Sequence, residues 1–450
     1  MNERATPLTD EVDGEEEISQ RRSNRGVAAA FALVAVALLV VVPHVVRYRT
    51  LSPIDELTHV DYLFRISNGS MLRQGDLLGQ DAMRELSCRR IDDVYEPPPC
   101  RSGRYDPQEF GHIKESGAAQ HPPLYYALTA YLGRGLQAAT GLDSLVDAGR
   151  LIGALWLAGG LILFWYAGGR LRISQAGRIV VAVLIATTPV VVHASTTVNN
   201  DASALAAGAV LAVLAVGFEQ ERVKPWVLIL GAALVVLAKS TNIVGVAGTA
   251  VFLGIRAVAR RGERAARDRL LWGSGALLAG AVVSVAGWLV VRDALARAPT
   301  SALVEFHQVG ALQVGDVLGQ AFALVTPVVN PHLPPFLQLS AVLFTIQLVN
   351  LAFIAGSFGG MLGAGRPGPP RGMGVAAALA MVLGGIAFTL INYFVAGVFF
   401  PIPPRYGLSL LPILGLALGA ALERLPALLT IGALAAVSAG VYAYGLIWGP

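Results

Sequence analysis

Four ionisable residues follow the first hydrophobic segment of the chain at close spacing. The stretch "LSPIDELTHVDYLFRI", residues 51–66, carries Asp55, Glu56, His59 and Asp61. A carboxylate can act as a general base, and a neighbouring acid or imidazole can orient it or help to bind a cation. If this stretch is helical, Asp55 and His59 share one face because they are four positions apart. The stretch is therefore a candidate catalytic site containing Asp55, Glu56 and His59.

The same stretch also has a purely structural interpretation. Ser52 suits the capping position of a helix, Pro53 suits the first helical position, and Asp55 falls three residues after Ser52, as in a capping box. Asp55 would then only accept hydrogen bonds from backbone N–H groups. Spacing alone leaves both interpretations open.

Two further polar stretches lie beside predicted membrane helices. "AAQHPPLYY", residues 118–126, contributes His121 and Tyr125, although tyrosines are also common at the membrane–water interface. "TTPVVVHASTTVNNDASAL", residues 187–205, contributes Asn200 and Asp201 in a short loop between apolar helices. Asp201 is a second candidate acidic group at the depth of Asp55, or else a helix cap.

Two isolated cations lie at comparable positions. Arg405 occurs in "FFPIPPRYGLSLLPIL", residues 399–414, and Lys239 in "LVVLAKSTN". An isolated arginine near a membrane surface can extend its side chain to water. Its planar guanidinium can also bind a phosphate with two hydrogen bonds. We consider Arg405 and Lys239 candidate phosphate ligands.

Composition places these residues in an all-α polytopic membrane protein. The 450 residues are 54% hydrophobic and only 14% charged, and several uncharged segments are long enough to cross a bilayer. We predict about eleven spanning helices, at 26–46, 149–169, 178–194, 201–218, 225–238, 242–256, 270–291, 338–362, 375–399, 407–422 and 426–448. The helix at 122–138 carries Arg134 and is expected to lie on the outer surface.

The distribution of Lys and Arg predicts the orientation. With the N-terminus in the cytoplasm, the inner segments hold eighteen basic residues and the short outer loops hold four, as the positive-inside rule requires. This topology accounts for the net charge of +4, and no nucleic-acid partner is expected. The predicted organisation is a disordered cytoplasmic tail at 1–25 and a transmembrane domain at 26–450. Within that domain 47–148 forms a large outer loop with juxtamembrane helices, and 292–337 forms a second outer loop.

The remaining ionisable residues also favour the outer side. Eighteen of the thirty carboxylates lie there, fourteen of them in 47–148, and none lies in the middle of a predicted span. A transporter of charged solutes more often has an ionisable residue near the bilayer midplane. Any chemistry is therefore expected at the extracytoplasmic face. The two cysteines, Cys88 and Cys100, both lie in the first outer loop, and we predict a disulfide between them because that compartment is oxidising.

Taken in order, these stretches resemble the C-type fold of membrane glycosyltransferases, the GT-C superfamily. The resemblance covers roughly residues 50–415 and rests on the acidic pair Asp55-Glu56, "HPPLYY", the loop with Asp201, and "PPRYGLSLLPIL". The form "DELTHVDYL" is most similar to bacterial members with an Asp-Glu-x-x-His segment. Unlike the better-known members, this sequence has no large soluble domain after its last helix.

The resemblance implies a GT-C-like bundle and a polyprenyl-phosphate-linked sugar as donor, since nucleotide sugars remain in the cytoplasm. Asp55 would be the catalytic base, with Glu56 and His59 beside it. Asp201 would be the second acidic residue, which binds a divalent cation, Mg²⁺ or Mn²⁺, in some members, where Asp55 would be the other ligand. Arg405 and Lys239 would hold the lipid phosphate, and His121, Tyr125 and Asn200 would line the pocket. The acceptor would be a glycan, lipid or protein of the cell envelope at the plasma (inner) membrane.

Two other functions remain open at this point. A polymerase or ligase of lipid-linked glycans also works at the outer face, although it usually depends on arginine-rich outer loops. A non-catalytic assembly or transport subunit is the second alternative. In such a subunit, Asp55 and Asp201 would have no reason to lie close together.

Overall fold

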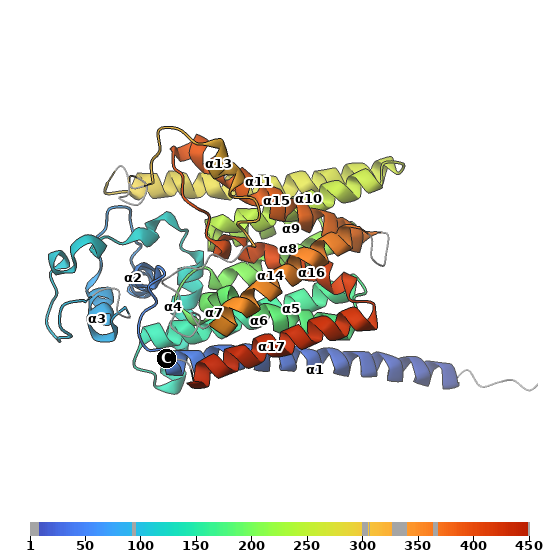
Figure 1. Cartoon of the computed structure of the whole chain (residues 1–450), viewed down its shortest axis with the longest axis horizontal. Coiled ribbons are helices and arrows are strands. Elements are labelled where there is room, and N and C mark those ends of the chain that lie inside the picture. Colours follow the sequence, from blue (N-terminus) through green and yellow to red (C-terminus); the bar gives the residue numbers. More distant parts are fainter. Residues whose placement is uncertain are drawn as a thin grey trace, which may run out of the picture.

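The computed structural model describes residues 9–91, 96–298, 305, 307–325, 340–362 and 368–448. The regular secondary structure in these ranges consists of helices (Figure 1). Within them no β-strand occurs, and strand-like pairing is limited to isolated bridges such as Leu77–Glu115. The predicted all-α class is therefore confirmed.

The chain forms a bundle of long apolar helices with a smaller helical layer at one end (Figure 1). The bundle helices are α1 (Thr9–Arg47), α5 (Leu145–Arg170), α6 (Gln175–Ala186), α7 (Pro189–Thr196), α8 (Ala202–Glu219), α9 (Pro225–Ala238), α10 (Ile243–Ala259), α11 (Arg264–Leu295), α14 (Ser340–Met361), α15 (Pro369–Ala396), α16 (Leu411–Ala421) and α17 (Leu425–Trp448). Large apolar side chains such as Leu39, Val283 and Phe394 are exposed on its outer surface. Exposed apolar side chains on long helices fit a lipid environment, and the chain is a multi-pass membrane protein.

Each of the eleven predicted spans coincides with a helix or a broken helix. Nine helices in the described ranges are long and apolar enough to cross a membrane, and the pair α6 and α7, bent by 66°, is a tenth if it counts as one span. The bend occurs at Thr187-Thr188-Pro189, where proline supplies no backbone donor and the threonine hydroxyls donate to carbonyls of Val183 and Leu184. The eleventh predicted span corresponds to α9, which has 14 residues and is only about 21 Å long.

The first helix begins earlier than expected. α1 begins at Thr9, so our prediction that the whole tail 1–25 is disordered is wrong for residues 9–25. Extending an existing helix adds one backbone hydrogen bond per residue without a new nucleation cost, so the helix continues toward the N-terminus beyond its candidate span, Gly26–Arg47. α1 starts beyond one end of the bundle and the C-terminus lies at the other end (Figure 1), as an odd number of crossings requires.

The smaller layer is formed by the first large loop. It contains α2 (Glu56–Ser67), α3 (Gln80–Arg89), η1 (Pro107–Ile113), η2 (Gly117–Gln120) and α4 (Leu124–Thr140). Leu57, Val60 and Leu63 of α2 pack in one apolar cluster with Met83 and Leu86 of α3. α4 has 17 residues and is not among the candidate spans; its position on the outer surface stays a prediction. Of the second loop, 292–337, the structure describes the end of α11 and the short helix α13 (Val314–Leu318), and it does not describe 326–337.

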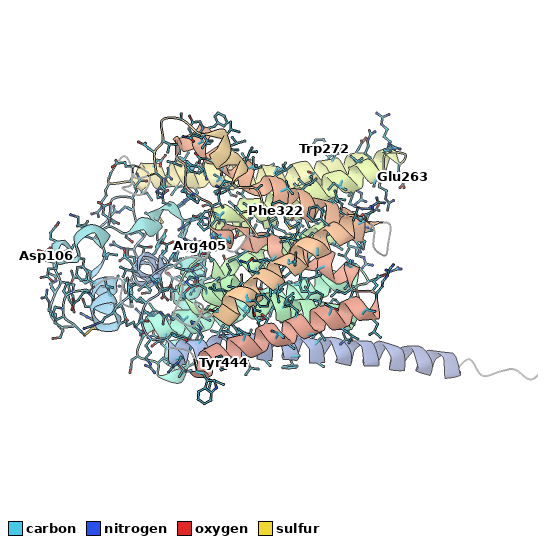
Figure 2. The ribbon with its side chains drawn as sticks, in the orientation of Figure 1. Asp106, Glu263, Trp272, Phe322, Arg405 and Tyr444 are labelled. Atoms are coloured by element: carbon cyan, nitrogen blue, oxygen red, sulfur yellow. A yellow bond between two sulfur atoms is a disulfide. The ribbon has the colours of Figure 1, made fainter. Side chains whose placement is uncertain are left out.

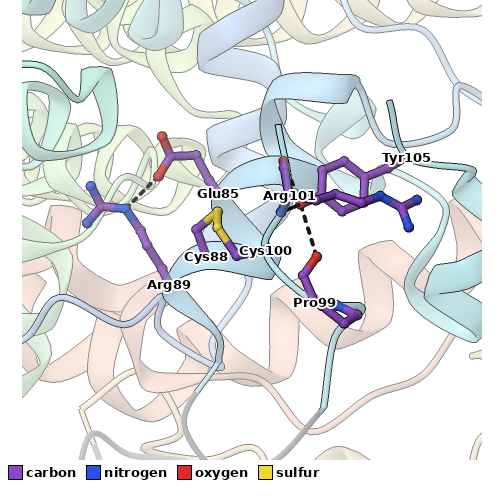
Figure 3. The surroundings of a disulfide bond; sticks show 7 residues. All are labelled: Glu85, Cys88, Arg89, Pro99, Cys100, Arg101 and Tyr105. Atoms are coloured by element: carbon purple, nitrogen blue, oxygen red, sulfur yellow. Dashed lines mark hydrogen bonds and ion pairs between the residues drawn. A yellow bond between two sulfur atoms is a disulfide. The ribbon is translucent and has the colours of Figure 1, made fainter. Parts of the chain in front are cut away.

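The predicted disulfide joins Cys88 at the end of α3 to Cys100 (Figure 3). The next residue, Arg89, forms an ion pair with Glu85 at 2.5 Å and with Asp147 of α5 at 2.9 Å. The cross-link thus holds α3 against the segment at Cys100, and Arg89 holds it against the first turn of α5.

Two glycines allow the close packing that positions the polar segments. A Cβ atom at Gly153 of α5 would collide with the backbone oxygen of Ser195 in α7, and a Cβ atom at Gly208 of α8 would collide with that of Ser409. Ser409 belongs to η5 (Pro404–Leu410), which leads into α16. These contacts bring the loop before α8 and the segment with Arg405 against the same end of the bundle.

Candidate active site

The beginning of α2 differs from the predicted cap. The helix begins at Glu56, and Asp55 is the N-cap residue with φ 60° and ψ −3°, a left-handed conformation that is uncommon outside glycine. The Asp55 side chain accepts no capping hydrogen bond, and neither does that of Asp201 at the N-cap of α8. The capping interpretation is therefore wrong for both residues, and their carboxylates are available for other contacts.

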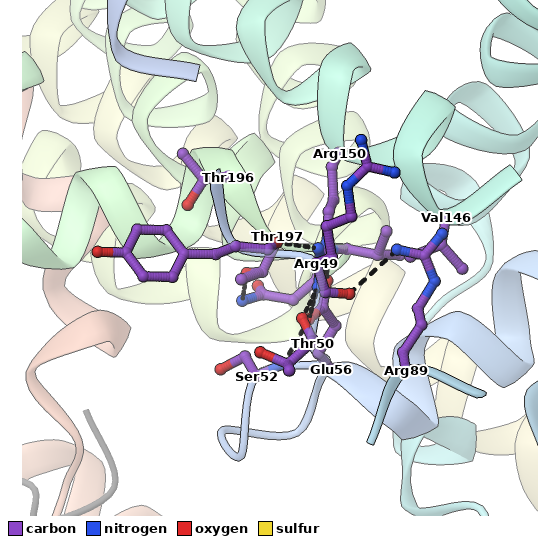
Figure 4. A network of polar contacts seen from close by, with 12 residues as sticks. Arg49, Thr50, Ser52, Glu56, Arg89, Val146, Arg150, Thr196 and Thr197 are labelled. Carbon is purple, nitrogen blue, oxygen red and sulfur yellow. Dashed lines mark hydrogen bonds and ion pairs between the residues drawn. The ribbon is translucent and has the colours of Figure 1, made fainter. Parts of the chain in front are cut away.

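Glu56 is fully buried and fully hydrogen-bonded. Its exposed fraction is 0%, and Arg150 of α5 donates to both carboxylate oxygens, at 2.7 and 2.6 Å (Figure 4). The backbone N–H groups of Ser52 and Val198 also donate to these oxygens, at 2.7 and 2.8 Å. Burial favours a higher pKa, but the charge of Arg150 and these hydrogen bonds outweigh it and lower the pKa of Glu56.

This Glu56–Arg150 cluster ties three segments together. Arg150 also donates to the backbone oxygens of Tyr48 and Thr50, at 2.8 and 2.6 Å. The cluster thus joins the end of α1, the start of α2 and the loop before α8, which includes Val198. Because its carboxylate already has four donors, we interpret Glu56 as a positioning residue rather than as the base.

Asp55 has a different environment. Its carboxylate forms an ion pair with Arg405 of η5, 350 residues later in the chain, and its side chain keeps an exposed fraction of 54%. Partial burial raises the pKa of Asp55, but the positive charge of Arg405 outweighs burial and leaves the pKa below its ordinary value. Asp55 is thus ionised at neutral pH and accessible from solvent.

Arg405 connects Asp55 to a buried second pair. Its Nε lies 3.7 Å from Oδ2 of Asp201, and the other oxygen of Asp201 contacts the ammonium group of Lys239. Exposed side-chain fractions fall along this series, from 54% for Asp55 to 19% for Arg405, 4% for Asp201 and 2% for Lys239. We call Asp55, Arg405, Asp201 and Lys239 the charge chain, because acidic and basic side chains alternate from the surface to the interior. Burial, together with the charge of Arg405, lowers the pKa of Lys239 well below its usual range. Figure 2 shows Arg405 where the bundle meets the smaller layer.

A column of four aromatic rings stands beside Asp55. The ring of His59 stacks on His121 at 5.5 Å and on Tyr126 at 5.8 Å, and Tyr126 stacks on Tyr62 at 4.0 Å. Nδ1 of His59 is hydrogen-bonded to the hydroxyl of Tyr126 at 2.6 Å. Burial, together with the neighbouring His121, lowers the pKa of His59 well below its usual range, and burial lowers that of His121 to about 3. Both imidazoles are therefore neutral at physiological pH.

The other predicted pocket residues occupy distinct positions. Tyr125 is 1% exposed and packs against Trp156 and Tyr126, so it belongs to the core of the smaller layer. Asn200 is 1% exposed, and its Nδ2 has no hydrogen-bond partner among the described residues. Nδ1 of His121 also has none there. Asn200 and His121 thus retain polar atoms that a bound ligand can satisfy.

Arg150 and Tyr126 are important residues that sequence reasoning missed. Arg150 is 2% exposed although it lies in the first turn and a half of a membrane helix. An ionisable residue inside a span normally has a partner, and this rule would have identified Arg150. Tyr126 could not be distinguished from Tyr125 in "PPLYY" before the face of α4 was known.

The carboxylates do not fit a dedicated metal site. Asp55 is paired with Arg405, and Asp201 contacts Lys239 and lies near Arg405. No group of three or more His, Cys, Asp or Glu side chains suited to a metal occurs among the residues that the structure describes. The predicted use of Mg²⁺ or Mn²⁺ by Asp55 and Asp201 thus has no matching donor set among the described residues, and it stays a prediction.

Comparisons with known proteins find similarity to solved structures only. No family model matches the chain, and no curated protein matches it. Four solved chains match it, and one of them is ArnT from Cupriavidus metallidurans bound to undecaprenyl phosphate. The two sequences are 16% identical, the TM-score is 0.45, and the alignment covers 90% of this chain. The chain spans 60% of the length of that ArnT structure.

Proposed function

We propose that this protein is a membrane glycosyltransferase that moves a sugar from a polyprenyl-phosphate donor to an acceptor hydroxyl at the extracytoplasmic face. The observation that carries the proposal is the charge chain. It brings a solvent-accessible carboxylate, Asp55, together with Arg405, which is suited to bind phosphate. Its four residues come from four separate segments of the sequence. Residues that merely cap helices or extend to water have no reason to converge in this way.

In the proposed reaction Asp55 acts as the general base. Its carboxylate removes the proton from the acceptor hydroxyl while that oxygen forms a bond to the anomeric carbon of the sugar. The bond between the anomeric carbon and the phosphate oxygen breaks, and the electron pair leaves with the lipid phosphate. This leaving group requires no proton, only stabilisation of its developing charge, which the Arg405 guanidinium provides. The proton on Asp55 then passes to solvent through its exposed side.

The neighbouring residues position these groups. Glu56 and Arg150 fix the start of α2 to α1 and α5, so Asp55 lies at a defined point above the bundle. His59 is neutral and bonded to Tyr126, so it does not compete with Asp55 for the proton. Lys239 contacts Asp201, which lies near Arg405, and we propose that it acts on the phosphate through Arg405 rather than by direct contact.

The proposed orientation places this end of the molecule outside the cytoplasm. The turn between α10 and α11 carries Arg260 and Arg261 beside Glu263, and Glu263 lies at the opposite end of the bundle (Figure 2). Basic loops are typical of the cytoplasmic side. The Cys88–Cys100 disulfide lies in the smaller layer, and disulfides persist in oxidising compartments. Both features support an extracytoplasmic active face in the plasma membrane.

The alternatives receive less support. A non-catalytic subunit gives no reason for Asp55 and Asp201 to meet, yet both lie against Arg405. A glycan polymerase or ligase usually depends on arginine-rich outer loops. In the first outer loop, 47–148, carboxylates outnumber arginines by fourteen to ten, and Arg65 and Arg89 there form ion pairs with carboxylates.

The test is transfer by the purified full-length protein in lipid nanodiscs. Incubation with polyprenyl-phosphate-linked sugars is expected to release the lipid phosphate when an acceptor is added, and nucleotide sugars are expected to give no release. Consumption of a nucleotide sugar alone, or of no lipid-linked sugar across a panel of donors and acceptors, would contradict the proposed function.

A further inference from the structure

The guanidinium of Arg405 serves two anions in the proposed reaction. It forms the ion pair with Asp55 that the structure shows, and it is the proposed ligand of the lipid phosphate. A carboxylate that is paired with a guanidinium is a weaker base than a free one, because the positive charge stabilises its ionised form. The base and the leaving group thus depend on the same cation.

We infer that Asp55 and the phosphate of the lipid donor compete for Arg405, so that donor binding releases Asp55 to act as a base. This inference rests on the proposed function and adds to it a coupling between donor binding and activation of the base. Without donor, the base is held by Arg405, and a water molecule or acceptor hydroxyl is not deprotonated by it.

The geometry around Asp55 permits its release. Its carboxylate has one hydrogen-bonding partner in the described part of the chain, Arg405, and no capping bond to α2. Because 54% of its side chain is exposed, water can solvate the carboxylate when the ion pair opens, so opening the pair costs little free energy. Glu56, the adjacent residue, has four donors and no exposed surface, so it cannot move in this way.

The geometry around Arg405 permits the exchange of partners. Nε of Arg405 is buried and has no hydrogen-bond partner among the described residues, although it lies 3.7 Å from Asp201. A buried donor without a partner is unfavourable, and a phosphate oxygen can satisfy it. Asp201, fixed by Lys239, keeps Arg405 in place after Asp55 leaves. The guanidinium can therefore turn from a carboxylate to a phosphate without losing its position.

The first test measures binding and requires no turnover. Undecaprenyl phosphate is titrated into the full-length protein in nanodiscs, and Kd is compared for wild type, Asp55→Asn and Asp143→Asn. Asp143 is an exposed residue of the loop before α5, so its variant is a control for removing one negative charge from this end. We expect Asp55→Asn to bind roughly two- to fivefold more tightly, the range for loss of a competing, partly exposed ion pair, and Asp143→Asn to match wild type. Equal or weaker binding by Asp55→Asn would overturn the inference.

A double-variant cycle separates competition from simple repulsion. If Asp55 merely repels the phosphate, the gain from Asp55→Asn persists in an Arg405→Gln background. If the two anions compete for Arg405, the gain disappears in that background. Millimolar inorganic phosphate is expected not to displace the lipid. Displacement would show that free phosphate binds at Arg405 as well as the lipid does, and it would overturn the inference that the lipid donor releases Asp55.

The second test uses the pH dependence of turnover. Asp55 faces Arg405 of η5, His59 of α2 and His121 after η2, with Asp201 and Lys239 behind Arg405. The acid limb of kcat/KM reports the free enzyme and that of kcat reports the donor complex. We expect the acid limb of kcat to lie at a higher pH than that of kcat/KM. In the donor complex the phosphate shares the charge of Arg405, so the pKa of Asp55 is lowered less than in the free enzyme. Coincident limbs would overturn the coupling, whereas an inactive protein that still shows the binding cycle would contradict the proposed function alone.

Discussion

Asp55 and Glu56 are neighbours in the sequence, and each pairs with an arginine from a distant segment, but the two ion pairs differ in burial and in the number of bonds. Glu56 is 0% exposed and accepts hydrogen bonds from Arg150, Ser52 and Val198. Asp55 is 54% exposed at its side chain and is paired with Arg405 alone among the described residues. One carboxylate is a permanent structural link, and the other is held by a single interaction at the surface.

The difference shows how one short segment can serve both stability and chemistry. A carboxylate with four donors has no lone pair left for a proton in transit, and opening its cluster would leave charges buried without a partner. A carboxylate with one donor and exposed surface can exchange that donor for another group. The buried Glu56–Arg150 pair therefore fixes the position of Asp55, whose pair with Arg405 can open.

The variant with the largest expected effect on activity is Asp55→Asn. Removing a general base typically lowers kcat by about 10²–10⁴-fold, and no capping bond is lost because Asp55 makes none. Turnover is measured with lipid-linked donor, and Tm is measured on the same preparation. We expect an unchanged Tm within about one degree. Retention of more than a tenth of wild-type kcat would exclude Asp55 as the base.

The next effect concerns the Glu56–Arg150 cluster and should appear in stability. Arg150→Met leaves the charge of Glu56 buried and unpaired, which costs about 3–5 kcal/mol in comparable pairs. Thermal unfolding in detergent should show the loss, and Arg150→Met with Glu56→Gln should recover part of it. If Arg150→Met instead unfolds like wild type and only loses activity, the division between a structural and a reactive pair is wrong.

A smaller effect is expected from replacing both cysteines with serine. The disulfide spans 12 positions, and a loop of this size stabilises a fold by about 3 kcal/mol at most. It anchors α3, whose Arg89 contacts Asp147 and Ser144 at the start of α5, close to Arg150. We therefore expect a lower Tm with kcat nearly unchanged at low temperature. A large loss of kcat in a protein that remains folded would place the disulfide among the determinants of the reactive pair.

Much of the architecture could be predicted from the sequence because membrane helices depend on local composition. Every predicted span coincides with a helix or a bent pair, since about twenty apolar residues suffice to indicate a span. The extension of α1 to Thr9 was missed because residues 9–25 lack apolar periodicity, whereas an adjacent stable helix can extend through such a segment. The disulfide was predictable because the chain has two cysteines, both in one loop.

The roles within the candidate site could be predicted only in part. The acidic pair after the first span drew attention to the correct segment, but the environments of its two members depend on contacts with Arg150, 94 residues away, and Arg405, 350 residues away. The helix start was misjudged because Ser52 and Pro53 satisfy the cap pattern, while the structure uses the backbone N–H of Ser52 to bind Glu56. Long-range pairing overrode a local signal in this segment.

The smallest expected effect, and the finest test of the comparison, is Arg405→Lys. Lysine keeps the positive charge near Asp55 and Asp201, but it lacks the planar fork that can hold two phosphate oxygens at once. We expect KM for the lipid donor to rise by roughly three- to tenfold, equivalent to the net contribution of about one ordinary hydrogen bond, with a smaller change in kcat. The matched variant Arg150→Lys, in the structural pair, should lower Tm and leave KM unchanged in the folded fraction. If both lysine variants affect only stability, then Arg405 is as structural as Arg150, and the distinction between an exchangeable and a permanent pair fails.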